Sequence, residues 1–512
     1  MDKLTRYSLE TIWKTEVPVE SIEAHAVICL VSEAEWITGH FPESWKQAIT
    51  SVKERGLFNG SENQMFTIPV KQGNSAATLV LVGTGEHPMS AEELRNLAAK
   101  AAKASMQVSA DQVVFAMPSS LVSYSATQDV ATVAHALTEG FILGTYRRKN
   151  YKQNQKAYIG PGKVIFHQEK ITIPNFQKEW EKGMSDGKAY AEGTIYARDI
   201  TNLPGNMLVP EDLARAAEDL ANKHGLEYSI MDEKKLEKKG MGGLFSVGKG
   251  SIHPPRMIVI KYQGKESWDG EIVGLVGKGI TFDTGGISLK PRVGMEEMIS
   301  DMGGAATVLG VLEALCITRP KRNVLVVIPT AENMPSGGAF KPGDVITTLS
   351  GRTVEILNTD AEGRVVLADG MTYAKELGAT RLIDVATLTG AVVSALGDVA
   401  TGAVSNDETF LNSFISASRR TGEKVWPLPA YPEFQEMLRS DVADLRNSTG
   451  RNAASSTAGL FIGTFADGMP WIHLDIAGTA FLTKERGVNP KGATGVMVRT
   501  IVEWILSDER VV

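Results

Sequence analysis

The chain has 512 residues, of which 43% are hydrophobic and 22% are charged. This composition excludes an intrinsically disordered chain, which would lack the apolar side chains needed to offset the entropy lost on ordering. The formal net charge of −7 gives no general affinity for polyanions, and the two cysteines, Cys29 and Cys316, exclude a disulfide framework and a multi-cysteine zinc site.

The N-terminal segment has neither the apolar core nor the small-residue cleavage site of a signal peptide. No uncharged apolar run reaches the roughly 18 residues that a membrane-spanning helix needs. The low cysteine count also suits a reducing compartment. We therefore expect a cytoplasmic, soluble protein without a membrane partner.

The first part of the chain, residues 1–174, alternates apolar runs with amphipathic segments. Three runs predict buried strands: Ala26–Val31, Ala77–Val82 and Val113–Met117. Between them, Ser90 and Glu93 form a capping box that predicts a helix start, and a second helix is predicted over residues 128–143. Strands that alternate with helices indicate an α/β domain with a mostly parallel sheet.

A basic stretch separates this part from the rest of the chain. Residues 146–156 hold five cations close to Tyr146 and Tyr151, and a Gly-Pro-Gly turn follows at residues 160–162. We expect the smaller N-terminal α/β domain to end at residue 174. Residues 175–198 then predict a polar linking helix, and residues 199–512 a larger second domain.

The second domain also reads as α/β. A helix is predicted to begin at Pro210 and to stop at Gly225. The apolar runs predict strands at Met257–Tyr262, Ile272–Val276, Val324–Ile328, Val354–Leu357 and Leu382–Val385. The main helices are predicted at Gly304–Ile317, Arg364–Leu377 and Gly495–Leu506. We expect a central mixed, mostly parallel sheet covered by helices.

Three segments of this domain place charged residues in Gly-rich turns beside apolar runs. They are VGKGITFDTGGISLKP (Val276–Pro291), SDMGGAA (Ser300–Ala306) and LNTDAEGR (Leu357–Arg364). Ligands of open α/β sheets bind beyond the carboxyl ends of the strands. We therefore expect one site to hold Asp283, Asp301, Asp360, Glu362, Lys278, Lys290 and Arg364.

Four carboxylates in one cleft repel one another unless cations lie between them. Oxygen ligands suit Mg²⁺, Mn²⁺ or Zn²⁺, and the second domain has no HExxH pair for a histidine-ligated zinc protease. Lys278 could serve as a neutral amine ligand, whereas Lys290 could stay protonated and stabilise charge on a substrate carbonyl. Any one of these carboxylates alone would more often be a solvated turn or cap residue, so the convergence of three segments carries the prediction.

The same three segments resemble the signature segments of the leucine aminopeptidase (cytosol aminopeptidase) family of two-metal peptidases, in particular its bacterial members. Further similar segments are ARDITNLPGN, PSGGAFKPGDV, DVATLTGA and HLDIAG. The resemblance covers about residues 190–505 strongly, and the N-terminal domain only loosely.

The resemblance implies a set of metal ligands. Asp283 and Glu362 would bridge two divalent ions, Lys278 and Asp301 would complete the tighter site, and Asp360 would ligate the exchangeable site. The implied ions are Mn²⁺ or Zn²⁺, with Mg²⁺ or Co²⁺ as alternatives, and they would share an activated water.

It also implies the reaction and its residues. Lys290 would be the electrophile, and Arg364 would hold a bicarbonate that acts as general base. The enzyme would remove the N-terminal residue, preferably Leu or another apolar residue, from peptides with a free N-terminus. Met298 and Ala477 would form the side-chain pocket, and the cleft would be lined by Asn358, Thr387, Leu388, Thr389 and Gly390. The family further implies a homohexamer.

Other functions give weaker signals. The basic stretch at residues 146–156 could bind nucleic acid, so the alternative is a DNA-binding regulatory protein with secondary peptidase activity, although a solvated domain junction is the simpler interpretation. Residues 243–250 nearly match a phosphate-binding loop but lack its final Ser or Thr. A two-metal phosphoesterase would need histidines, and an inactive scaffold would be expected to have lost one of the seven charged residues.

Overall fold

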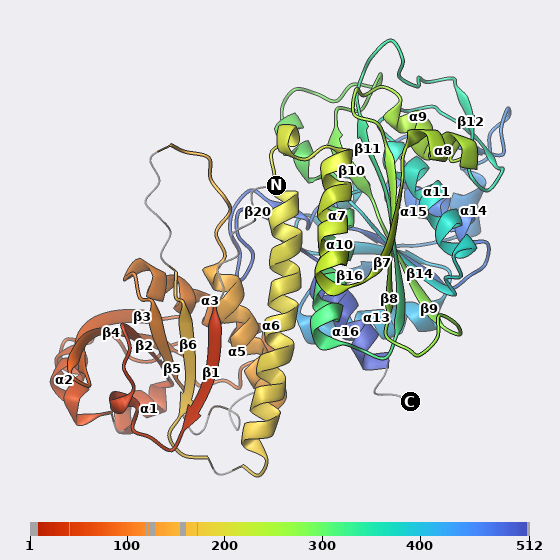
Figure 1. Cartoon of the computed structure of the whole chain (residues 1–512). Coiled ribbons are helices and arrows are strands. Elements are labelled where there is room, and N and C mark those ends of the chain that lie inside the picture. The colour runs from red at the N-terminus through yellow and green to blue at the C-terminus, as the bar shows by residue number, and fades with distance from the viewer. Residues whose placement is uncertain are drawn as a thin grey trace. The chain divides into compact units, whose positions relative to one another are not determined.

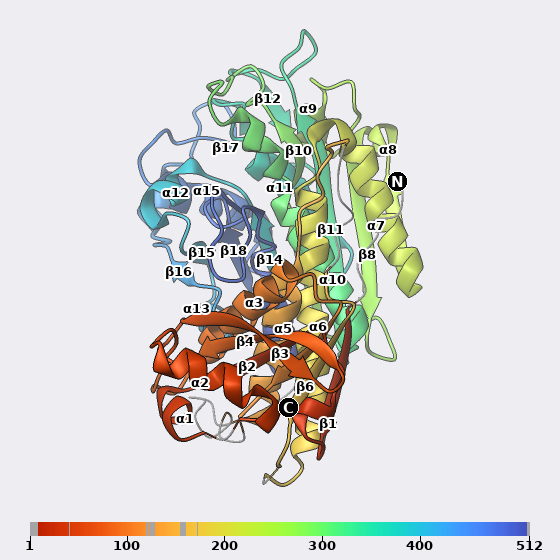
Figure 2. The same ribbon diagram turned by 90° about the vertical axis from the view of Figure 1, so that its left-hand side faces the viewer.

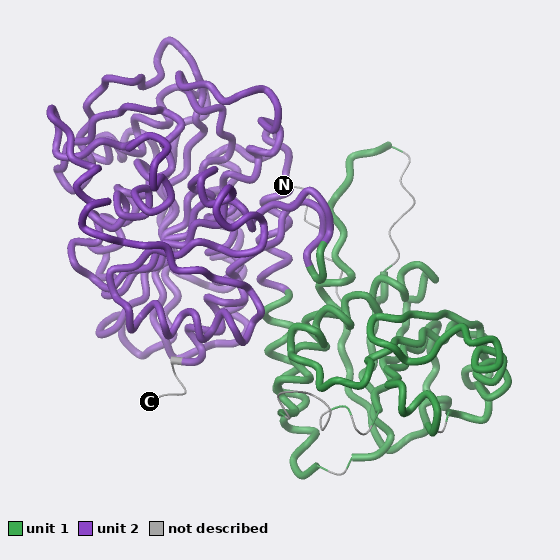
Figure 3. The backbone as a smooth tube through the Cα atoms, turned by 180° about the vertical axis from the view of Figure 1, so that it is seen from behind, with its two compact units in different colours: residues 1–191, 486–488 green, residues 192–485, 489–512 purple. Residues whose placement is uncertain are grey.

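The structure is a computed structural model that describes residues 9–39, 41–118, 121, 129–153, 160–171 and 173–508. Within these residues the chain forms two compact units (Figure 3). Unit 1 extends to Ala191 and includes Arg486–Val488, and unit 2 comprises Glu192–Glu485 and the residues from Asn489 onward. The three-part division expected from the sequence stays a prediction.

Unit 1 contains one sheet of six strands in the order β1-β6-β5-β2-β4-β3. The strands are β1 (Glu10–Thr15), β2 (Ala26–Val31), β3 (Met65–Gln72), β4 (Ser75–Gly83), β5 (Gln112–Ala116) and β6 (Lys163–Gln168). All neighbours pair in parallel except β3, which is antiparallel to β4. The central strands are the apolar runs that the sequence predicts, because a sheet covered on both faces buries every side chain.

Helices cover both faces of this sheet, with α1 and α2 on one side and α3 and α5 on the other (Figure 2). They are α1 (Glu33–Thr38), α2 (Lys46–Glu54), α3 (Ala91–Gln107) and α5 (Val130–Thr145). The capping box predicted at Ser90 is present at the start of α3. The expected start of the next helix at residue 128 lies outside the described residues.

Helix α6 (Phe176–Thr201) contains the segment predicted as a linking helix. The predicted helix is present and polar in composition, but it also buries the aromatic side chains of Trp180 and Tyr190. Within unit 1, Trp180 stacks on Phe176, with ring centroids 5.5 Å apart, and it also packs on Trp13.

Unit 2 is built on a mixed sheet in the order β16-β15-β18-β14-β9-β11-β8-β7, with β10 paired to β11 (Figure 1). Its strands are β7 (Glu227–Met231), β8 (Arg256–Gln263), β9 (Ile272–Gly277), β10 (Gly279–Asp283), β11 (Asn323–Asn333), β14 (Arg381–Ala386), β15 (Thr401–Ser405), β16 (Val425–Pro427) and β18 (Trp471–Asp475). The central strands β10, β11, β9, β14 and β18 are parallel, whereas β8 and β15 are antiparallel to their inner neighbours. The prediction of a mixed, mostly parallel sheet is confirmed.

Two helix layers enclose this sheet (Figure 1). One layer contains α7 (Pro210–His224), α10 (Gly303–Thr318), α13 (Glu408–Thr421) and α16 (Val498–Asp508). The other contains α8 (Glu233–Lys239), α9 (Gly242–Gly248), α11 (Glu362–Glu376), α14 (Pro432–Glu436) and α15 (Ala454–Gly463), and α12 (Gly390–Leu396) follows β14. Short strands β12 (Val345–Thr347), β13 (Thr353–Glu355), β17 (Leu445–Arg446), β19 (Phe481–Leu482) and β20 (Gly492–Ala493) form two further sheets.

One segment, Met295–Thr318, is long and apolar enough to cross a membrane by composition, but 83% of its most apolar window is buried inside the protein. It contains α10, whose apolar side chains pack between the central strands and α16. Burial on all sides explains its composition, as expected for a core helix.

Several predicted boundaries differ from the structure; strand β11, for example, extends to Asn333, five residues beyond the predicted end at Ile328. Helix α11 begins at Glu362, two residues before the expected start, and β13 ends at Glu355. The chain leaves the strand there because the amides of Leu357 and Asn358 donate to a side chain, that of Asn447. Helix α16 begins only at Val498, because Gly495 has a left-handed φ of 67° that no helix accommodates.

Candidate functional site

The charged segments predicted from the sequence meet at one edge of the unit 2 sheet. Lys278 separates β9 from β10, Asp283 ends β10, and the turn at residues 387–389 follows β14. Asp301 precedes α10, and Glu362 is the first residue of α11. Because the central strands are parallel, their carboxyl ends all reach this edge, where open α/β sheets bind their ligands.

Glycines allow the two helices to approach this edge closely. A Cβ atom on Gly304, in the first turn of α10, would lie 2.0 Å from the carbonyl oxygen of Val385. A Cβ atom on Gly363, in the first turn of α11, would lie 2.5 Å from Cε of Lys278. Only glycine fits at these two positions, which is why the predicted segments are rich in glycine.

Lys278 is the buried centre of the site. Its Nζ lies 2.9 Å from Oδ1 of Asp301 and 2.9 Å from Oε1 of Glu362, and it donates to the carbonyl oxygen of Thr387 at 2.8 Å. The side chain is only 3% exposed. One ammonium group therefore joins all three charged segments and the turn after β14.

Lys290 pairs with the other two carboxylates. Its Nζ lies 2.8 Å from Oδ2 of Asp283 and 2.6 Å from Oδ1 of Asp360. Its side chain is 21% exposed, so it faces the solvent side of the site, whereas Lys278 lies at the base. We call the six residues the lysine–carboxylate cluster: Lys278, Lys290, Asp283, Asp301, Asp360 and Glu362.

The cluster holds more negative than positive charge. Burial raises the pKa of Asp283 and Asp301, and it raises the pKa of Asp360 to about 6. Burial alone would also raise the pKa of Glu362, but the two lysines outweigh it, so that this pKa is lowered. The pKa is thus raised for three of the four carboxyl groups and lowered for one, which indicates that the two lysines do not balance the negative charge of the site.

The pKa of both lysines is raised by the carboxylates around them. Burial lowers the pKa of Lys278, but the charges of Asp301, Glu362 and Asp283 outweigh it, and the pKa lies above that of a free lysine. The pKa of Lys290 is raised in the same way, against burial, by Asp283 first. A divalent cation among the carboxylates would replace the charge that the proton on Lys278 supplies here.

The donor set fits divalent cations. One carboxylate oxygen from each of Asp283, Asp301 and Glu362 lies within 4.8 Å of the others, and all three residues are buried. The second oxygen of Glu362, Oε2, is buried and finds no hydrogen-bond donor among the described residues. A buried oxygen of this kind costs free energy unless a cation or donor reaches it, and oxygen ligands suit hard or borderline cations.

Arg364 follows Glu362 of the cluster by two residues, in the first turn of α11. Its Nη1 donates to the carbonyl oxygen of Asn447 at 2.7 Å, and its buried Nε finds no acceptor in the described part of the chain. Burial lowers its pKa to about 10, against the opposing effect of Glu362 and Asp475, so the guanidinium stays charged at neutral pH. A planar anion is the ligand that such a group binds best.

Two asparagines hold the cluster in shape, and the sequence analysis assigned them no role. Nδ2 of Asn333, at the end of β11, donates to Oδ1 of Asp283 at 2.8 Å. The fully buried Asn447 accepts from the amide of Leu357 at 2.8 Å and donates to the carbonyl oxygen of Asn358 at 2.6 Å. Asn333 is at the carboxyl end of an apolar strand, where ligand-binding residues are expected, so the sequence could have indicated it. Nothing near Asn447 in the sequence signals its contacts.

Asp475 holds the turn after β14. The buried carboxylate accepts hydrogen bonds from the amide of Leu388 at 3.1 Å, from the hydroxyl of Thr389 at 2.7 Å and from the amide of Ala477 at 3.2 Å. Thr387, at the start of the turn, donates its hydroxyl to Asp301 at 2.7 Å. The turn is therefore fixed to the cluster at one end and to β18 at the other.

The residues predicted to bind substrate surround this arrangement. Thr387, Leu388 and Ala477 are half-buried, and Gly390, the first residue of α12, is exposed. Asn358 lies two residues before Asp360 in the chain, and its side-chain oxygen accepts a hydrogen bond from the amide of Asp360 at 2.9 Å. Met298 is half-buried on a 3₁₀ helix, and its carbonyl oxygen accepts from the amide of Asp301.

Two weaker sequence signals also have a place in the structure. Residues 242–248 form helix α9 and not a phosphate-binding loop. The described part of the basic stretch, Arg147 to Lys152, is exposed and follows α5, with Nζ of Lys149 5.6 Å from the ring of Tyr151. Lys156 lies outside the described residues.

Comparisons with known proteins agree with this geometry. The catalytic-domain model of the cytosol aminopeptidase family matches residues 195–502, and its N-terminal-domain model matches residues 30–155. A probable cytosol aminopeptidase of Alkaliphilus metalliredigens is 44% identical over 457 residues, which cover 88% of this chain and 90% of that protein. A probable cytosol aminopeptidase of Bacillus subtilis is 51% identical over 372 residues, 72% of this chain and 73% of that protein.

Solved structures show the same fold. The bottromycin maturation enzyme BotP, in complex with Mn, matches with a TM-score of 0.82 at 34% identity, over 95% of this chain and 99% of that one. A tomato leucine aminopeptidase mutant matches with a TM-score of 0.85 at 27% identity, over 98% of this chain and 97% of that one. The chain therefore belongs to the cytosol aminopeptidase family, together with curated bacterial relatives, and is a metal-dependent exopeptidase.

Proposed function

We propose that this protein is a leucyl aminopeptidase that removes an N-terminal leucine or another apolar residue from peptides. The observation that carries the proposal is the lysine–carboxylate cluster, in which four carboxylates outnumber two ammonium groups inside a buried site. Such a site has the charge to bind divalent ions and keeps one lysine, Lys290, accessible to a substrate.

The metal ligands proposed are those that the motifs predict. Asp283 and Glu362 would bridge two ions, Lys278 and Asp301 would complete the tighter site, and Asp360 would ligate the exchangeable one. When bound, such ions supply Lewis acidity to a peptide carbonyl and lower the pKa of a water molecule. We propose Mn²⁺ or Zn²⁺ for this protein, since oxygen-rich sites accept both and the similar BotP structure is a complex with Mn.

Lys290 would stabilise the charge that develops on the scissile carbonyl oxygen. Its ammonium group stays protonated. Burial lowers its pKa, but the charges of the surrounding carboxylates, that of Asp283 above all, raise the pKa by more. It already lies at hydrogen-bond distance from Asp283 and Asp360, so it needs little reorganisation to face a carbonyl held there. A preorganised donor of this kind contributes strongly to the rate.

Arg364 would hold a bicarbonate that takes up the proton of the attacking water. The support is its buried, charged guanidinium with Nε directed at no acceptor of the described chain. Asn447 fixes the group through Nη1, which leaves the remaining donors for a planar anion.

Specificity would come from the residues around the turn after β14. Met298 and Ala477 would contact an apolar first side chain, and the turn held by Asp475 would contact the peptide backbone through residues 387–390. We further propose a cytoplasmic protein, in line with relatives that are named cytosol aminopeptidases, and the homohexamer that the resemblance of the motifs implies.

The test is hydrolysis of leucine p-nitroanilide by protein stripped with a chelator, with Mn²⁺, Zn²⁺, Mg²⁺ or Co²⁺ added back. We expect metal to restore activity and Lys290→Ala to lower kcat by about 100-fold or more while two ions still bind. Lys341→Ala is the matched control, because Lys341 is an exposed lysine that pairs only with its neighbour Asp344. Full activity in Lys290→Ala would remove the electrophile, and no activity with any metal would remove the proposal.

The alternative of a DNA-binding regulatory protein rests on the basic stretch alone. Its described residues from Arg147 to Lys152 are exposed, as in a solvated loop. A salt-dependent mobility shift with duplex DNA would support the alternative, because phosphate contacts weaken as salt rises. The absence of a shift at low salt would exclude it.

A further inference from the structure

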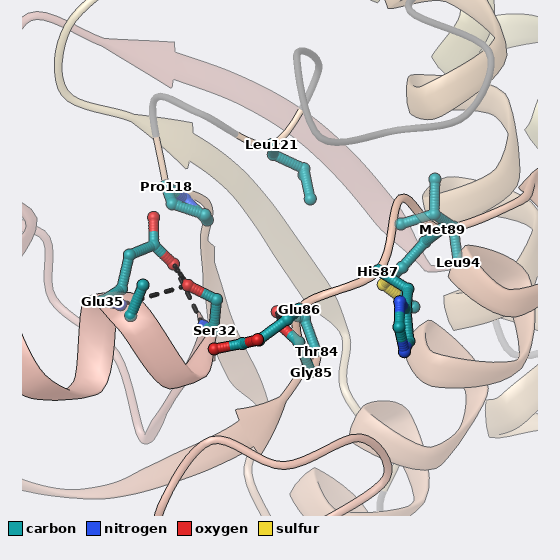
Figure 4. Close-up of a pocket in the computed structure, with 11 residues that line it drawn as sticks. Ser32, Glu35, Thr84, Gly85, Glu86, His87, Met89, Leu94, Pro118 and Leu121 are labelled. Atoms are coloured by element: carbon teal, nitrogen blue, oxygen red, sulfur yellow. Dashed lines mark hydrogen bonds between the residues drawn. The ribbon is translucent and has the colours of Figure 1, made fainter.

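A second cavity lies at the carboxyl ends of the strands of unit 1 (Figure 4). Its volume is about 260 Å³, and its lining comes from the segments that follow β2, β4 and β5. The chain leaves β2 toward β4 and leaves β5 toward β6, in opposite directions along the sheet. The cavity therefore lies at a topological switch point, where open α/β sheets bind ligands.

The cavity has a polar and an apolar end. Figure 4 shows Ser32, Glu35 and Glu86 toward one side and Met89 and Leu94 toward the other. Pro118 and Leu121 add further apolar surface. The volume is slightly below the roughly 300–1,000 Å³ of pockets that hold drug-sized molecules. A small molecule with an apolar body and one polar group matches this shape.

The charge of the lining selects against anions. Glu35 and Glu86 both line the cavity, and none of the described lining residues is a lysine or arginine. Oε2 of Glu35 accepts hydrogen bonds from the amide of Ser32 at 3.1 Å and from its hydroxyl at 3.0 Å. The protein's own carboxylate thus takes the amide that a phosphate would otherwise approach at this turn.

His87 is the one described lining side chain that can carry positive charge. The charge of His87 is also the smallest of the causes that lower the pKa of Glu93, after the hydrogen bonds from Ser90. Among the described lining residues, two carboxylates therefore stand against one imidazole.

We propose that this cavity binds a small aliphatic amine. Its ammonium group would lie between the carboxylates of Glu35 and Glu86, and its aliphatic body would pack against Met89 and Leu94. Opposite charge in a partly enclosed site orients the amine, and burial of its aliphatic chain against apolar side chains adds affinity. The proposal concerns unit 1 alone and holds whether or not unit 2 is a leucyl aminopeptidase.

The test follows isotope-labelled methionine methyl groups by NMR in the full chain during titration with isoamylamine. The chain has 18 methionines, of which Met89 lines this cavity and Met298 lies beside the lysine–carboxylate cluster. Met89→Leu and Met298→Leu assign the two signals. We expect the Met89 signal to shift in a saturable manner, with isoamyl alcohol and isocaproate causing no saturable shift. The same titration with L-leucine and L-leucinamide then shows whether the cavity accepts the ammonium group of a zwitterionic amino acid or only that of an amine without a carboxylate.

Two variants localise the effect. Glu86→Gln should weaken binding by about tenfold, because one of the two charges is removed from an exposed loop position. Ala34→Trp should abolish it by filling the cavity from an exposed lining position. A shift of the Met298 signal alone would place amine binding in the peptidase site and overturn the proposal. So would equal binding of isocaproate or inorganic phosphate at Met89, or binding that both variants leave unchanged.

Discussion

The two units place different chemistry on the same kind of sheet edge. In unit 2, the ends of the parallel strands carry six charged residues that are largely buried and paired with one another at 2.6–2.9 Å. In unit 1, the equivalent edge carries a small cavity with two carboxylates and an apolar wall. The architecture fixes where a ligand binds, and the residues that follow the strands decide which ligand it is.

The largest effect is expected from Gly363→Ala, which tests whether the unit 2 edge depends on close packing. The new Cβ atom would lie 2.5 Å from Cε and 2.7 Å from Nζ of Lys278. Because Lys278 is buried and joined to three segments, it cannot move aside without losing its partners. We expect peptidase activity to fall by about 100-fold or more.

The matched control for this variant is Gly337→Ala, since a Cβ atom at Gly337 meets no other atom within 4 Å. Leucine p-nitroanilide assays of both variants, with circular dichroism to establish folding, decide the matter. Equal activity of the two variants would contradict the packing described for Lys278.

Asn447→Ala should have the next largest effect, because it removes the side chain that ties residues 357–361 together. The amide of Leu357 and the carbonyl oxygen of Asn358 would lose their partners, at a cost of about 0.5–1.5 kcal/mol for each part-buried hydrogen bond. We expect lower thermal stability and at least about tenfold weaker metal affinity. Calorimetric metal titration measures the second effect, and unchanged affinity would show that this loop does not position Asp360 and Glu362.

A smaller effect concerns pH and the buried Asp369 of α11, which accepts hydrogen bonds from the amides of Leu244 and Leu349 at 2.8 Å each. Burial raises its pKa to about 7 from the ordinary value of 3.8. The folded state then retains a proton that the unfolded state releases, so the free energy of unfolding should fall as pH rises through this interval. The upper limit of that fall is about 4 kcal/mol, at about 1.36 kcal/mol for each unit of pKa difference.

Urea unfolding of wild type and Asp369→Asn between pH 5 and pH 8 measures this contribution, because asparagine cannot titrate. The wild type should lose stability relative to the variant as pH rises. Parallel profiles would mean that Asp369 titrates alike in the folded and unfolded states.

The smallest effect on catalysis is expected from the unit 1 cavity. Ala34→Trp fills a cavity formed by unit 1 residues only. We therefore expect kcat and KM for leucine p-nitroanilide to stay within about twofold of wild type, as for most surface substitutions. A large loss of kcat in a folded variant would show that the unit 1 cavity and the peptidase site are coupled. It would contradict the claim that the two sites act independently.

The sequence predicts several central strands of each sheet, but it misses the inner strands β6, β10 and β18 as well as edge strands. The strands β2, β4, β9 and β14 are nearly continuous apolar runs, because both of their faces are buried. Strands β3 and β7 alternate exposed and partly buried residues at the sheet edges, and the sequence analysis did not identify them. Edge strands take their structure from pairing with neighbours, which local composition does not reveal.

Site residues were predictable where a local sequence pattern marks them, and not where they depend on contacts between distant segments. Asp283, Asp301 and Glu362 occur in Gly-rich turns beside apolar runs, and the structure brings them together. Asn447 lies far along the chain from the loop that it supports, 90 residues from Leu357 and 89 residues from Asn358. Contacts between such distant segments depend on the completed fold, so the polar supports of the cluster could be found only in the structure.

The central claim is that the lysine–carboxylate cluster binds two divalent ions in each chain. The most direct measurement is the metal content of protein dialysed against Mn²⁺ or Zn²⁺, for wild type and Asp360→Asn, by elemental analysis. The account predicts two ions per chain in the wild type and one tightly held ion in the variant, because Asp360 would ligate only the exchangeable site. One ion or none in the folded wild type, or two equally tight ions in the variant, would contradict it.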